Sequence, residues 1–108
     1  MPHRRNILRR IRILVIEDET DTRDLLGFVL RSHGATPFLA SNVSDALELL
    51  EKERPDVVVA DIGMPGYNGY AFIAALRKLQ SRIRRTPVIA LTTFMSRRAG
   101  VWSSISMM

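Results

Sequence analysis

The feature that most constrains the fold is a set of short runs that are apolar at almost every position. They are IRILVIED (residues 11–18), DVVVAD (56–61) and TPVIALTT (86–93). A strand with one solvated face alternates apolar and polar residues, whereas a strand covered on both faces is apolar throughout. We therefore expect three strands buried on both faces. A weaker strand follows the first in ATPFLAS (35–41), where Pro37 indicates a sheet edge.

Three stretches with helical periodicity separate these strands, at residues 20–34, 43–54 and 72–79. Their apolar side chains are Leu25, Leu26, Val29 and Leu30, then Val43, Ala46, Leu47 and Leu50, then Phe72, Ile73, Leu76 and Leu79. The candidate N-caps are Thr20 and either Ser41 or Asn42, and the candidate stops are Gly34 and Pro55. Buried strands that alternate with helices predict an α/β protein with a doubly wound parallel sheet.

Length, composition and charge narrow the class of protein. A chain of 108 residues is one domain, and the absence of cysteine excludes disulfides and thiolate metal sites. No apolar stretch reaches the ~20 residues of a membrane span, so we expect a cytoplasmic location without a membrane partner. The net charge of +5 equals that of residues 1–12, which carry five arginines and no acid. This basic segment has no aromatic residue for stacking on bases, which argues against a nucleic-acid partner.

Three acids lie at the ends of two predicted strands. Glu17 and Asp18 end the first strand of the chain, and Asp61 ends the third. In a flavodoxin-like sheet these two strands are neighbours, and ligands bind at their carboxyl ends. An all-oxygen cluster without His or Cys suits a hard divalent cation, for which we expect Mg²⁺. A carboxylate beside Mg²⁺ is also a competent nucleophile toward phosphorus.

Two further residues extend this cluster. The Thr92 hydroxyl, at the end of the next strand, could donate to a phosphoryl oxygen, and the Gly63 carbonyl could bind the metal. Each residue also has an ordinary explanation, because acids at strand ends are often loop residues, threonines pack their methyl groups and glycines serve turns. Three acids at one switch point favour a functional site.

The sequence resembles the receiver domain of two-component response regulators. ILVIEDE, DVVVADIGMPGYNGY and TPVIALTT occur in the family's order between residues 11 and 93. The family pattern D-x-x-M-P-x-x-x-G falls on Asp61, Met64, Pro65 and Gly69, and DIGMPG resembles receivers attached to hybrid histidine kinases. The resemblance implies a flavodoxin-like sheet of order 2-1-3-4. Together with the charge distribution, it divides the chain into a basic arm or linker at residues 1–10, a receiver at 11–95 and an atypical tail at 96–108.

The resemblance also implies a role for each residue of the cluster. Asp61 is the phosphoacceptor, Glu17 and Asp18 are the acidic pair that holds Mg²⁺, the Gly63 carbonyl completes the metal shell, and Thr92 is the switch hydroxyl. The implied partners are a histidine kinase, hybrid kinases included, or a phosphotransfer protein, together with a downstream protein. Such a chain accepts a phosphoryl group and is not an enzyme.

The end of the chain departs from the family pattern. Receivers carry a lysine at the end of a fifth strand, about twenty residues past the switch threonine, and then a final helix. The only lysines here are Lys52 and Lys78, and AGVWSSISMM resembles neither element. We therefore expect a receiver that stops before its fifth strand and leaves the fourth strand as an exposed edge.

Three other functions remain open at this stage, and one of them is nucleic-acid binding through the basic segment, which salt-dependent binding would reveal. A receiver without the lysine could act as a protein-interaction module that is not phosphorylated. A hydrolase that resembles the haloacid dehalogenases would need a second aspartate two residues after the nucleophile, where this chain has Gly63.

Overall fold

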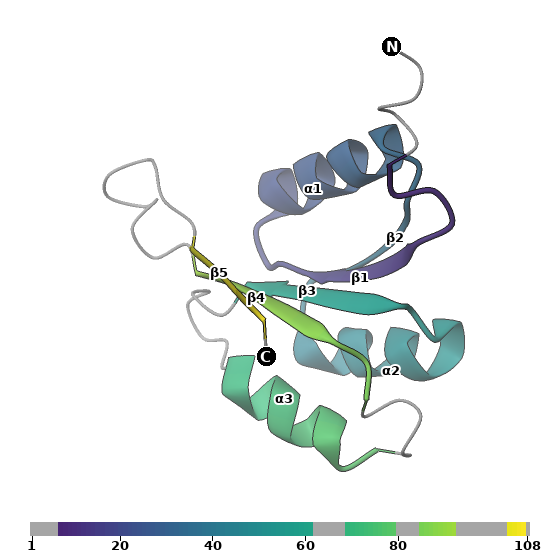
Figure 1. Cartoon of the computed structure of the whole chain (residues 1–108). Coiled ribbons are helices and arrows are strands. Elements are labelled where there is room, and N and C mark those ends of the chain that lie inside the picture. Colours follow the sequence, from purple (N-terminus) through teal and green to yellow (C-terminus); the bar gives the residue numbers. More distant parts are fainter. Residues whose placement is uncertain (1–6, 62–68, 80–84, 93–103, 108) are drawn as a thin grey trace.

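Four parallel strands and one antiparallel strand form a single sheet in the computed structural model of the chain (Figure 1). The structure describes residues 7–61, 69–79, 85–92 and 104–107. The elements in chain order are β1 (Arg12–Ile16), α1 (Thr20–Ser32), β2 (Thr36–Ala40), α2 (Val43–Glu53), β3 (Val57–Asp61), α3 (Gly69–Arg77), β4 (Val88–Thr92) and β5 (Ser104–Met107). The strand order is β2-β1-β3-β4-β5, so the predicted order 2-1-3-4 and the edge position of β2 are confirmed.

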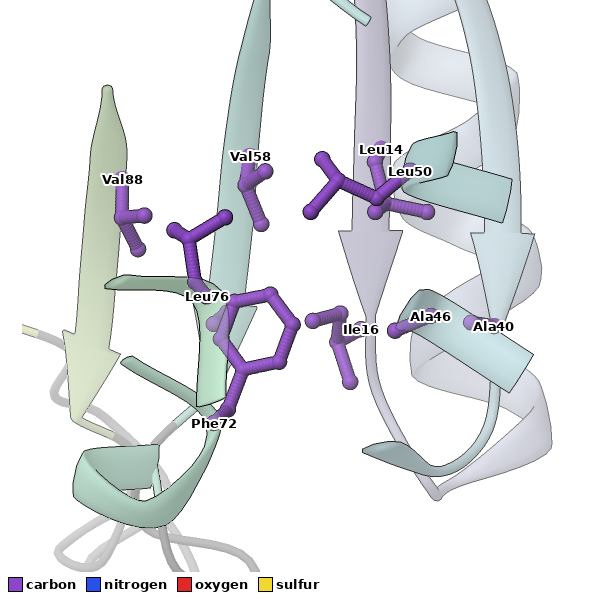
Figure 2. Packing of buried hydrophobic residues seen from close by; sticks show 10 residues of the cluster. Leu14, Ile16, Ala40, Ala46, Leu50, Val58, Phe72, Leu76 and Val88 are labelled. Atoms are coloured by element: carbon purple, nitrogen blue, oxygen red, sulfur yellow. The ribbon is translucent and has the colours of Figure 1, made fainter. Parts of the chain in front are cut away.

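Helices cover both faces of the sheet, as the uniformly apolar strands predict. Figure 1 shows α1 on one side of the sheet and α2 and α3 on the other. The cluster under α2 and α3 includes Phe72 and Leu76, whose side chains point toward Ile16 and Val58 of the strands in Figure 2. A second cluster under α1 contains Ile13 and other alternate strand residues. Successive residues of a strand point to opposite faces, which is why each strand contributes to both clusters.

The helix ends largely follow the local signals. Asn42 is the N-cap of α2, since its side chain accepts a hydrogen bond from the backbone N–H of Asp45 at 2.8 Å. Gly34 follows α1 with a positive φ of 94°, as expected of a residue after a helix. Thr20 is not the N-cap of α1. Glu19 takes that place, because its backbone is extended and its side chain accepts a hydrogen bond from the N–H of Thr22.

The fifth strand corrects one expectation. We expected a tail without a buried strand and an exposed edge at β4, but β5 pairs with β4 in antiparallel register, with Thr92 opposite Ser104. An uncovered β4 would leave a row of backbone N–H and C=O groups without partners, and an antiparallel segment satisfies them as well as a parallel one. In the described part of the chain, β5 rather than β4 is therefore the edge strand opposite β2.

Arg12 joins several elements at the amino end of the sheet. Its guanidinium Nη2 donates to the Glu53 carbonyl at 2.7 Å and to the Glu53 carboxylate at 3.1 Å. The same guanidinium lies over the Phe38 ring, 4.8 Å from the ring centroid. The backbone N–H of Arg12 also donates to the Asp56 carboxylate at 2.8 Å. These contacts tie β1 to β2, to the end of α2 and to the start of β3.

Across the described residues, no helix combines the length and the apolar character that crossing a membrane requires.

Candidate functional site

The site begins with two carboxylates at the carboxyl ends of neighbouring strands. Parallel pairing brings Ile16 of β1 opposite Ala60 of β3, so the next residues, Glu17 and Asp61, lie at the same edge of the sheet. Glu17 continues the ladder through its backbone N–H, which donates to the Ala40 carbonyl at 3.0 Å. Glu17 is 2% exposed and Asp61 3% exposed, which leaves both carboxyl groups out of contact with bulk water. The structure thus brings together two of the three carboxylates that we expect to converge, and their roles stay predictions.

The Asp61 carboxyl group perturbs the ionisation of Glu17. The pKa of Glu17 is raised from the ordinary 4.5 to about 7. Burial is the largest cause, and the neighbouring Asp61 adds to it through a hydrogen bond and through like charge. The backbone N–H of Glu19 donates to the Glu17 carboxylate at 3.0 Å and acts in the opposite direction. Two buried carboxylates in contact repel each other when both are ionised, and a cation bound between them would offset that repulsion.

Asp18 occupies a different environment from its neighbour. It is exposed, whereas Glu17 is buried, although Asp18 still contributes to the raised pKa of Glu17. The guanidinium of Arg23, in the first turn of α1, donates to the Glu17 carbonyl at 3.0 Å and reaches the Asp18 carbonyl at 3.5 Å. Arg23 therefore holds the backbone of the acidic pair against the helix.

Arg23 was missed by the sequence analysis. The signal that could have found it is its position five residues after Asp18, because a side chain in the first turn of a helix can reach back over the preceding loop. The distinction between a buried Glu17 and an exposed Asp18 was also not predicted, since both residues follow the same strand.

The donor set fits a hard cation in its chemistry. Glu17 and Asp61 supply buried, negatively charged oxygens, which are the ligands that Mg²⁺ prefers. Within the described ranges, however, no three His, Cys, Asp or Glu side chains are grouped closely enough to form a metal site. The third predicted carboxylate, Asp18, is exposed, so its side chain would have to turn toward the other two for all three to bind one ion.

The remaining predicted residues are described only in part. Gly63, Met64 and Pro65 lie outside the described residues. Gly69 is the first residue of α3, and Thr92 is the last residue of β4, the strand next to β3. The side chain of Thr92 lies outside the described part, so the role of its hydroxyl stays a prediction.

Comparison with known proteins identifies the family. The sequence profile of the response regulator receiver domain matches residues 13–101, which is most of the chain. The chain belongs to the receiver domain family of response regulators. Membership of this family accounts for the strand order of the sheet and for the acidic residues at the ends of β1 and β3.

Relatives of known sequence span the same region of this receiver domain. An uncharacterized 14.6 kDa protein in the sodA1 3′ region of Leptolyngbya boryana is 42% identical over 87 residues, which cover 81% of this chain and 66% of that protein. The phosphate regulon transcriptional regulatory protein PhoB of Escherichia coli (strain K12) is 38% identical over 81 residues, 75% of this chain and 35% of PhoB. The receiver domain thus spans less than two thirds of either relative.

Solved structures agree with the fold. The chemotaxis response regulator CheY4 of Vibrio cholerae superimposes with a TM-score of 0.71 at 28% identity, over 83% of this chain and 76% of that one. A sensor protein from Polaromonas sp. JS666 gives a TM-score of 0.70 at 29% identity, over 77% of this chain and 66% of that one. The flavodoxin-like fold predicted from the strands is therefore confirmed.

Proposed function

We propose that this receiver domain accepts a phosphoryl group on Asp61 from a histidine kinase or a phosphotransfer protein. The observation that carries the proposal is the burial of Asp61 at the tip of β3, in contact with Glu17. A rigid strand holds the carboxylate in one position, which is what a nucleophile in phosphoryl transfer requires. A carboxylate that served only as a loop residue would lie in water.

The transfer exchanges one bond to phosphorus for another. A carboxylate oxygen of Asp61 forms the new bond to phosphorus, and the bond from phosphorus to the histidine nitrogen of the donor breaks. Glu17, Asp18 and Asp61, with the Gly63 carbonyl, would hold Mg²⁺, which supplies neutralising charge for the phosphoryl oxygens. Arg23 positions the backbone of the acidic pair through its contacts to the two carbonyls.

The consequence of the transfer would be a change in a binding surface. Thr92 ends the strand beside Asp61, and its hydroxyl is the group we assign to contact the phosphoryl oxygens and to transmit the change to a downstream protein. In this role the chain is a substrate of phosphoryl transfer and a signalling component rather than an enzyme.

Radiolabel transfer tests the proposal. The chain is incubated with Mg²⁺ and either a phosphorylated histidine kinase or acetyl phosphate, and the label on Asp61→Asn is compared with that on the native sequence. We expect label that is stable in acid and labile in base, and none on Asp61→Asn. Asp56→Asn, which changes an exposed aspartate just before the same strand, is the matched control and should keep the label. Label that persists on Asp61→Asn would place the acceptor elsewhere.

A receiver that works through binding alone is the second candidate. The observation that favours it is the composition of β5. This strand (Ser104–Met107) pairs antiparallel with β4 and lacks the lysine that receivers carry at the end of their fifth strand. A fixed cation on the phosphoryl oxygens is part of the electrostatic stabilisation of such transfers, and removing one comparable group costs roughly 10²–10³ in rate. A native chain that takes no label from either donor at saturating Mg²⁺ would favour this candidate.

A further inference from the structure

The outer side of α1 presents apolar side chains to solvent. Leu25 is 60% exposed and Phe28 is 67% exposed. The opposite side of the helix is the one that packs, because Gly27 lies against Leu39 of β2 and Leu26 belongs to the cluster under α1. The exposure of Leu25 and Phe28 is therefore not a by-product of an unpacked helix.

These two residues belong to a stripe with the spacing of a helix contact. Asp21, Leu25, Phe28 and Ser32 follow one another at steps of four, three and four residues, which is the spacing through which two helices pack side by side. All four are exposed. In Figure 1 no other described helix lies on the α1 side of the sheet, so nothing in the described part of the chain covers this stripe.

Charges of opposite sign flank the stripe at its two ends. Asp21 and Asp24 lie in the first half of α1, and Arg31 lies in its last turn. Within the described residues none of the three forms an ion pair, whereas Arg12 and Glu53 do. Asp24 and Arg31 are two helical turns apart and so lie along the same edge of the stripe.

We infer that the outer stripe of α1 is a self-association surface, on which a second copy of this chain docks with its α1 antiparallel. A two-fold axis that passes between Asp24 and Arg31 brings each Asp24 opposite Arg31 of the second copy and stacks Leu25 and Phe28 at the centre. The same surface serves both copies, so the interface is isologous and closes as a dimer. An antiparallel pair places opposite charges together, whereas a parallel pair would place like charges together.

Sedimentation velocity on the whole chain tests the inference, over concentrations from micromolar to about 1 mM. We expect a monomer–dimer equilibrium that Phe28→Asp weakens at least 100-fold, because central aromatic residues carry most of the affinity of such contacts. Ile7→Asp is the matched control, since Ile7 is 66% exposed but lies outside the stripe, and it should leave the dimer intact. Circular dichroism melts establish that both variants fold. A chain that stays monomeric up to about 1 mM overturns the inference.

Charge reversal tests the antiparallel arrangement separately. Asp24→Arg and Arg31→Asp should each weaken the dimer about tenfold, because each places like charges opposite one another twice. The double variant Asp24→Arg/Arg31→Asp should restore the native affinity, and a mixture of the two single variants should form heterodimers. Neither single variant depends on Asp61, so loss of phosphorylation and loss of the dimer are distinguishable. A dimer that is indifferent to both charge reversals would lie on another surface.

Discussion

The two ends of the sheet handle charge in opposite ways. At the amino end, the guanidinium of Arg12 contacts the carbonyl and the carboxylate of Glu53 and lies over Phe38. These groups are partly exposed and of opposite sign, so their ionised forms attract each other. At the carboxyl end, Glu17 and Asp61 are buried beside each other with the same sign. Their ionised forms repel each other until a proton or a cation is bound.

The charges at the amino end of the sheet stabilise the fold, whereas those at the carboxyl end suit ligand binding. Opposite charges in contact stabilise the folded state over the whole range in which both are ionised. Like charges in contact cost stability, and a protein retains them where a ligand restores the balance. Mutations at the amino end should therefore change only the free energy of unfolding. Mutations at the carboxyl end should change how that free energy depends on pH and on Mg²⁺.

The largest effect should come from titration at the carboxyl end. The pKa of Glu17 is raised from 4.5 to about 7 in the folded state. Because the folded state binds the Glu17 proton more tightly than the unfolded state, this proton stabilises the fold. That stabilisation is complete below about pH 4.5 and is lost as the pH rises through about 7. The free energy of unfolding should fall by about 3–4 kcal/mol across this window, since one pKa unit is worth about 1.4 kcal/mol. Urea denaturation at a series of pH values, without metal, measures it.

Two variants assign that pH dependence to its source. Glu17→Gln removes the titrating group while it keeps the shape of the side chain, so the fall in stability with pH should largely disappear. Glu48→Gln, on the exposed side of α2, should leave the native dependence in place. A Glu17→Gln variant with the full native dependence would mean that another group titrates.

Removal of the contact at the amino end should cost stability at every pH. Arg12→Ala loses two hydrogen bonds to Glu53 and the contact with the Phe38 ring, for which we expect about 2 kcal/mol. Arg9→Ala, an exposed arginine outside this group, is the control and should change little. Chemical denaturation measures both, and radiolabel transfer should be unchanged in Arg12→Ala where it still folds. Equal stability of the two variants would remove the role given to Arg12.

Mg²⁺ should act at the carboxyl end alone. A ligand at ten times its dissociation constant stabilises the folded state by about 1.4 kcal/mol. We expect that gain near pH 8, above the raised pKa of Glu17, and a smaller gain near pH 5, where a proton occupies the Glu17 carboxyl group. Melting temperatures with and without Mg²⁺ measure it in the native chain, in Arg12→Ala and in Asp18→Ala. The gain should persist in Arg12→Ala and be lost in Asp18→Ala, and a gain that survives in Asp18→Ala would exclude that residue as a ligand.

The smallest effect concerns the backbone at the amino end. Arg54, the C-cap that follows α2, has a left-handed backbone with a φ of 50°, which glycine adopts without steric cost. Arg54→Gly should raise the free energy of unfolding by about 0.5 kcal/mol, because the relief of strain is partly offset by the greater freedom of the unfolded chain. Arg54→Ala keeps the strain and should show no gain by thermal denaturation. A gain in both variants would point to the lost side chain rather than to the backbone.

Much of the fold could be predicted from the sequence because its signals are local. Consecutive apolar residues in 13–16 and 57–60 indicate strands that are buried on both faces, and helical spacing locates α1, α2 and α3 within a few residues. The order of the strands then brings Glu17 and Asp61 together, although more than forty residues separate them in the chain. A candidate site at the ends of β1 and β3 therefore follows from the sequence.

Three features were decided only by the tertiary structure. Glu17 and Asp18 are adjacent acids after one strand, and only the packing of the neighbouring elements buries the first and exposes the second. The contact of Arg23 with the loop before α1 depends on where that helix lies on the sheet. β5 pairs with β4 through backbone groups, which every residue other than proline carries alike, so side-chain patterns do not encode the pairing. Local periodicity specifies strands and helices, but burial and edge pairing arise from contacts between segments that lie far apart in the chain.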